Sequence, residues 1–145
     1  ATALNNLAES YRALGRYEEA EPLYLQAIEI GEATIGTAHP DYAIRLNNLA
    51  NLLKDMGRYE EAEPLFRQAI EIDEATIGTA HPGYATDLNN LAKLLKDMGR
   101  FEEAEPLFDQ AVAIFEDRLG AEHPTTIKVK ANREKFREAR AAAGR

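Results

Sequence analysis

The sequence contains no cysteine and no long apolar run. The absence of cysteine excludes disulfides, zinc–thiolate sites and thiol nucleophiles. No stretch approaches the roughly 18 apolar residues that a membrane-spanning helix needs, and no charged-then-apolar leader opens the sequence. These absences favour a cytoplasmic protein. Position 1 is not Met, so we expect the chain to be part of a longer protein.

Positive charge is scarce outside the last residues. The formal net charge is −8, yet residues 127–145 hold seven Lys and Arg against two Glu. The other 126 residues are therefore strongly acidic and should repel nucleic acid and anionic membranes, whose phosphates need cations to bind. We interpret the basic end as a solvated helix or a contact with the acidic body of another copy. Binding of nucleic acid or lipid is the less economical alternative.

What the sequence does contain is one unit written three times. Gly15, Gly57 and Gly99 lie 42 residues apart, and residues 1–42 differ from residues 43–84 at only twelve positions. Each copy holds the strings LNNLA, GR(Y/F)EEAEPL and QA(I/V). Such a period is typical of stacked units that bury their apolar faces against neighbouring copies.

Each copy has the pattern of two helices. The first is predicted over residues 40–56, opened by Pro40 and stopped by Gly57. The second is predicted from Tyr59 to Thr76, with acidic residues that favour its positive N-terminal end. Both have an apolar face at helical spacing. These faces consist of Leu46, Leu49, Ala50, Leu53 and Met56, and of Ala62, Leu65, Phe66, Ala69, Ile70 and Ile72.

The two ends of the array differ. Residues 124–143 begin like a fourth copy, but only Val129, Phe136, Ala139 and Ala143 continue the apolar face. This pattern predicts a capping helix with one solvated side. No corresponding cap precedes the first copy. We therefore expect the first helix to expose apolar surface, through which copies of the protein could stack.

The repeat resembles the tetratricopeptide repeat. The matching positions are Leu46, Leu49, Ala50, Leu53, Gly57, Tyr59, Ala62, Phe66 and Ala69, with equivalents 42 residues earlier and later. The usual unit has 34 residues, and the longer unit found here is similar to the kinesin light chain subtype. The resemblance implies an all-α fold, an α-solenoid in which antiparallel helix pairs form a right-handed superhelix. We expect repeats at residues 1–38, 39–80 and 81–122 and a capping helix at 123–145, all in one continuous domain.

The resemblance also implies a protein–protein interaction module whose first helices line a concave groove. In members that bind peptides, an Asn corresponding to Asn6, Asn48 and Asn90 contacts the ligand, and we expect that role for these three. Their amides offer donors and an acceptor to a peptide backbone. A helical wheel places Asn47 and Asn51 opposite the leucines. The remaining candidate groove residues are Asn5, Asn47, Asn89, Glu9, Asn51, Lys93, Arg12, Lys54 and Lys96. Alternatively, the asparagines were merely duplicated or bond a neighbouring helix.

Other functions find less support in the sequence. His39, His81 and His123 recur before Pro, but no second ligand stands three or four residues away, so loop packing and helix capping are favoured over metal binding. No phosphate loop or Ser/His/Asp arrangement is present, and we expect neither an enzyme nor a cofactor. The remaining alternative is a structural spacer, or a self-assembling or engineered scaffold, with no dedicated ligand.

Overall fold

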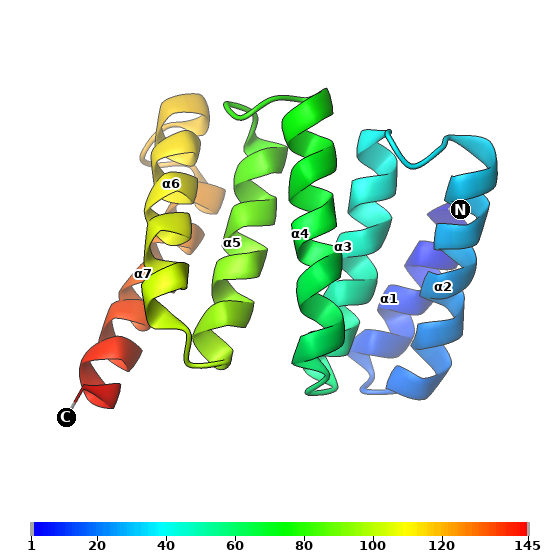
Figure 1. Cartoon of the computed structure of the whole chain (residues 1–145), viewed down its shortest axis with the longest axis horizontal. Helices are drawn as coiled ribbons and strands as arrows, with labels where there is room; N and C mark the ends of the chain where they lie inside the picture. Colours follow the sequence, from blue (N-terminus) through cyan, green and yellow to red (C-terminus); the bar gives the residue numbers. More distant parts are fainter. Residues whose placement is uncertain (1, 145) are drawn as a thin grey trace. The chain divides into compact units, whose positions relative to one another are not determined.

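The computed structural model describes residues 2–144, and the side chains of residues 3–144. This part of the chain is helical and contains no β-strand (Figure 1). Its helices are α1 (Thr2–Ala13), α2 (Tyr17–Thr34), α3 (Pro40–Asp55), α4 (Tyr59–Thr76), α5 (Pro82–Asp97), α6 (Phe101–Leu119) and α7 (Pro124–Ala143). The all-α prediction is confirmed, and α3 and α4 match their predicted bounds to within one residue. No helix in the described range is long and apolar enough to cross a membrane.

The helices form two compact blocks, which we call the N-terminal block (Ala1–Thr76) and the C-terminal block (Ile77–Arg145). In the N-terminal block, α2 packs on α1 and on α3, and α3 packs on α4. In the C-terminal block, α6 packs on α5 and on α7. Within each block, helices that follow one another in sequence run antiparallel (Figure 1).

Histidine caps the first helix of each later copy. The Nδ1 atoms of His39, His81 and His123 accept hydrogen bonds from backbone N–H groups two residues on, at 3.0, 2.8 and 3.1 Å. Each cap is followed by Pro at the first helical position, where its missing N–H costs nothing. The prediction that these histidines cap helices is confirmed. No cluster of three metal-ligating side chains occurs among the residues that the structure describes.

Glycine ends the same helices. Gly57 has φ +76°, a left-handed conformation that favours Gly over residues with a Cβ. Its N–H donates to the Lys54 carbonyl, and the Arg58 N–H donates to the Leu53 carbonyl at 2.8 Å. This pair of bonds is the Schellman motif, which satisfies carbonyls that the helix leaves open. The predicted stop at Gly57 is confirmed.

The helices α3 and α5 bury more of their surface than the single apolar face that the sequence predicts. Leu46, Leu49 and Leu53 are buried as expected, but Leu52 is also 0% exposed. Because α3 packs against both α2 and α4, it buries two adjoining faces. Leu94 of α5 is likewise 0% exposed.

Candidate functional site

The three leading candidate asparagines keep access to solvent. Asn6 on α1 is exposed, and Asn48 on α3 and Asn90 on α5 are half-buried. Asn6 and Asn48 belong to the N-terminal block and Asn90 to the C-terminal block. Each described first helix therefore presents one accessible amide at the same repeat position.

The neighbouring asparagines are placed differently from the prediction. Asn47 and Asn89 are only 8% exposed, so their predicted position on the solvent face is wrong. For Asn47 the reason is that α3 packs on both α2 and α4, which the helical wheel did not include. Asn5 is half-buried, and the Oδ1 atoms of Asn5 and Asn89 are inaccessible and have no hydrogen-bond partner among the described residues. In this conformation a ligand cannot reach those oxygens.

The remaining candidates are all half-buried, and the two on α1 are bonded within the N-terminal block. They are Glu9, Arg12, Asn51, Lys54, Lys93 and Lys96. The Nε of Arg12 donates to Asp55 on α3 at 2.6 Å, and its Nη1 contacts Glu9 at 3.4 Å. A ligand carboxylate would have to compete with these two acids for Arg12.

Tyr24, which is not among the predicted groove residues, completes this cluster. Its hydroxyl donates to Glu9, and burial together with this bond raises the pKa of the phenol. The equivalent residues are Phe66 and Phe108, which need no acceptor. Comparison of the three copies contains a signal for this pair, since the copy that has Tyr24 in place of Phe is also the one that has an acid, Glu9, at the other position.

Arg58 joins successive repeats of the N-terminal block. Its Nη1 donates to Glu21 on α2 at 2.9 Å, while its Nε and Nη2 bind Glu61 at 2.6 and 2.7 Å. The bonds from Arg58 hold the pKa of the Glu61 carboxyl below its ordinary value. The arrangement is a clamp that ties α2 to the first turn of α4.

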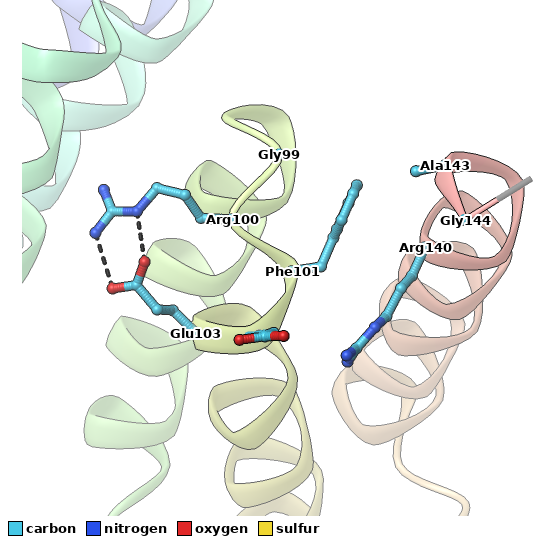
Figure 2. Close-up of a pocket in the computed structure, with 8 residues that line it drawn as sticks. Gly99, Arg100, Phe101, Glu103, Arg140, Ala143 and Gly144 are labelled. Carbon is cyan, nitrogen blue, oxygen red and sulfur yellow. Dashed lines mark hydrogen bonds and ion pairs between the residues drawn. The ribbon is translucent and has the colours of Figure 1, made fainter.

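Two open pockets lie at equivalent turns. One, of about 570 Å³, lies between residues 15–19 and the end of α3; the other, of about 580 Å³, lies between residues 99–103 and the end of α7. Figure 2 shows the second, with the Arg100 guanidinium bound to Glu103 and Arg140 extending from α7 towards α6. Arg16 and Glu19 form the same pair in the first pocket. These paired charges stabilise the turns.

The helix pairs, their caps and the 42-residue period define an all-α helical repeat protein. The tetratricopeptide repeat profile matches residues 1–75, 46–117 and 84–132. The chain belongs to the tetratricopeptide repeat family and is of the kinesin light chain-like type. Repeats of this family generally serve as non-enzymatic protein-interaction modules.

Solved structures with the same fold are known. The nearly identical TPR-like repeats of a protein described as a kinesin light chain from Podosopora anserina superpose with a TM-score of 0.88 at 27% identity, covering 97% of this chain and 66% of that one. A point variant of those repeats gives a TM-score of 0.87 at 27% identity, with the same coverage. BtubC (BKLC) from P. vanneervenii shares the fold, with a TM-score of 0.76 at 22% identity over 97% of this chain and 63% of that one. This chain thus spans about two thirds of the length of each solved relative. No curated protein matches the sequence.

Proposed function

We propose that the protein binds an extended peptide or partner segment in a concave groove lined by its first helices. The observation that carries this proposal is the difference between neighbouring asparagines. Asn6, Asn48 and Asn90 remain accessible, whereas Asn47 and Asn89 are buried. An accessible amide at one position of each repeat can both donate to and accept from a peptide backbone.

The ligand is held mainly by amides in this proposal. Arg12 is engaged by Asp55 and Glu9, so it contributes less to anchoring than its charge suggests. Backbone recognition also suits a surface whose repeats are nearly identical, since a peptide backbone repeats the same donors and acceptors along its length. Asn51, Lys54, Lys93 and Lys96 flank the three amides and supply secondary contacts.

The test begins with a peptide selected from a random phage-display library on the intact chain. Its affinity is measured by calorimetry against a variant that combines Asn6→Ala, Asn48→Ala and Asn90→Ala. Each net hydrogen bond contributes about 0.5–1.5 kcal/mol, so the triple variant should bind at least tenfold more weakly.

The matched control removes one amide per repeat from the second helices. Gln26, Gln68 and Gln110 occupy equivalent positions and are all exposed. Their combined change to Ala should leave the affinity unchanged. Equal losses in the two triple variants would mean that the amides of the first helices have no special role, and the proposal would be abandoned.

A second candidate function is a scaffold in which copies stack through α1. It is favoured by the exposure of Leu7, at 47%, and Leu14, at 69%, which agrees with the predicted apolar surface at that end. Light scattering over a concentration series tests it. Oligomers that grow with concentration and disappear with Leu7→Ser would support stacking, and a monomer at every concentration would count against it.

A further inference from the structure

The accessible amides of the first helices are the same in every copy, so they do not set the direction in which a ligand lies. A peptide backbone could contact them in either orientation. Any preference for one orientation must come from accessible residues that differ between the copies. Three positions after each of these amides, the copies hold Glu9, Asn51 and Lys93. This position therefore changes from acidic through neutral to basic along the chain.

The acidic member belongs to a cluster with an excess of negative charge. Glu9 is half-buried, and its carboxylate accepts from Arg12 at 3.4 Å and from the Tyr24 hydroxyl. The Arg12 guanidinium is bonded more closely to Asp55, at 2.6 Å. Two carboxylates thus share one guanidinium, and the cluster keeps one negative charge in excess. A basic side chain of a ligand would balance this charge.

The basic member lies on α5, where the local excess of charge has the opposite sign. Lys93 is half-buried and therefore keeps access to solvent. Lys96 and Asp97 follow it at i+3 and i+4, so these three side chains carry two positive charges and one negative charge. Residues at such spacings are neighbours on the surface of a helix. An acidic side chain of a ligand is favoured here.

The middle copy adds an exposed apolar side chain. Ile44 of α3 is 54% exposed, although it is a large aliphatic residue. The equivalent residue of α5 is Thr86. Ile44, Asn48 and Asn51 are spaced at i, i+4 and i+7 and therefore share one side of α3. The uncharged middle of the series thus favours an aliphatic side chain of the ligand.

We propose that the groove selects an extended peptide by its order of charges. A basic side chain of the peptide meets Glu9, an aliphatic one meets Ile44, and an acidic one meets Lys93. This inference rests on the proposed function, because it concerns the same ligand site. The amides hold the backbone, and the three differing side chains fix its direction, since the reversed peptide would bring like charges together. The basic residue three positions further on is shared by every copy and does not distinguish the two ends.

The probe is a random peptide phage-display library, selected on the intact chain. Peptides selected by the wild type should carry a basic and an acidic residue in one constant order, with an aliphatic residue between them. A swap variant combines Glu9→Lys, Tyr24→Phe, Lys93→Glu and Phe108→Tyr. It gives the first copy the pair of residues that the third copy has, and the third copy the pair of the first, so both pairs are ones that the repeat already accommodates. This variant should select the reverse order.

Single changes measure each contact on the tightest selected peptide by calorimetry. Glu9→Gln and Lys93→Gln should each weaken binding about two- to fivefold, as expected for a partly exposed ion pair. Ile44→Thr introduces the residue that α5 has at this position, and it should weaken binding about fivefold because apolar contact area is lost.

The matched control combines Glu29→Lys and Lys135→Glu. Both residues are exposed and lie on α2 and α7, outside the proposed groove. Like the swap variant, this control reverses one charge of each sign and keeps the net charge. It should select the same order as the wild type. Circular dichroism confirms that each variant is folded.

Selected peptides without a constant charge order, or an order that the swap variant leaves unchanged, would overturn this inference. Unchanged affinity in both Gln variants would do the same. The proposed function would survive either result if the triple asparagine variant still weakened binding. A reversed order in the swap variant, together with full affinity in the triple asparagine variant, would instead uphold the charge selection and reject the amide contacts. Failure to select any peptide would contradict both.

Discussion

At the scale of single residues, positions 9–14 set the first copy apart. They read ESYRAL, against NLLKDM and KLLKDM in the later copies, and hold six of the twelve differences between the first two copies. Glu9 accepts from Tyr24, Arg12 binds Asp55, and Ser10 stands where Leu52 is fully buried. The substitutions replace an apolar contact surface with local polar pairs.

The pair formed by Glu9 and Tyr24 should behave as a coupled unit. Tyr24→Phe removes the hydroxyl donor from Glu9 and leaves it only Arg12, and Glu9→Leu leaves a buried hydroxyl without its acceptor. Each single change should lower the free energy of unfolding by about 1–2 kcal/mol, and the double variant should lose less than the sum. Urea denaturation of the four proteins measures the coupling. Strict additivity would show that the hydrogen bond contributes nothing.

The N-cap of α5 allows two replacements of the same histidine, by Ala and by Asn, to be compared. His81→Ala removes the acceptor for the Gly83 N–H, which it now holds at 2.8 Å. Loss of an N-cap acceptor should lower the free energy of unfolding by about 1 kcal/mol, whereas His81→Asn keeps an acceptor and should cost only a few tenths. Thermal and urea unfolding distinguish the two. Equal destabilisation by Ala and Asn would mean that the imidazole acts through packing instead.

At the scale of elements, α7 is the clearest case of a helix held by two kinds of contact. Val129 and Phe136 are buried, and the Phe136 ring lies 4.9 Å from Phe108 between centroids. The cations of α7 meet acids of α6, as in Lys130 with Glu116 at 3.3 Å. Further pairs join Arg133 and Arg137 to Asp109, and Arg140 to Glu105. The basic segment thus contacts the acidic surface of its own chain, whereas the sequence had indicated a solvated helix or a contact with another copy.

The apolar contact should dominate the docking of α7. Phe136→Ala removes a fully buried ring and should cost about 3–4 kcal/mol, which releases α7 from α6. Asp109→Asn removes an exposed partner of two arginines and should cost less than about 1 kcal/mol, because water and salt screen such pairs. Hydrogen exchange of α7 amides reports both. Faster exchange with Asp109→Asn than with Phe136→Ala would reverse this ranking and identify the ion pairs as the main restraint.

At the scale of the whole molecule, the repeat makes much of the architecture predictable. The periodicity, Pro40 and Gly57 place α3, and the kinesin light chain-like pattern implies the helix pairs. The burial of Asn47 was not predictable from a wheel, because it depends on a second helix packing against α3. The pairs of α7 with α6 likewise depend on the register of two helices, which local spacing does not contain. Tyr24 and Glu9 lie between these cases, since comparison of the copies shows them changing together.

The pH profile of the whole chain follows from pKa values that differ between the folded and unfolded states. Arg58 lowers the pKa of Glu61, so this stabilisation is present above the pKa of an unfolded glutamate, about 4.3, and is lost as the pH falls through the folded value. Burial and Glu9 raise the pKa of Tyr24, so its stabilisation is present below the unfolded tyrosine pKa, about 10, and is lost as the pH rises through the folded value. Stability should therefore be greatest between these limits.

Two variants distinguish the acid limb of the profile, where stability falls at low pH, from the alkaline limb, where it falls at high pH. Arg58→Gln should raise the pKa of the Glu61 carboxyl, which NMR can measure, and should make the acid limb shallower. Tyr24→Phe should make the alkaline limb shallower and leave the acid limb unchanged. Glu60→Gln serves as the control, since Glu60 is an exposed neighbour of Glu61 on the same helix, and its acid limb should match the wild type. Urea midpoints at a series of pH values give both limbs. If Arg58→Gln left the Glu61 pKa and the acid limb unchanged, the clamp between α2 and α4 would not operate in solution.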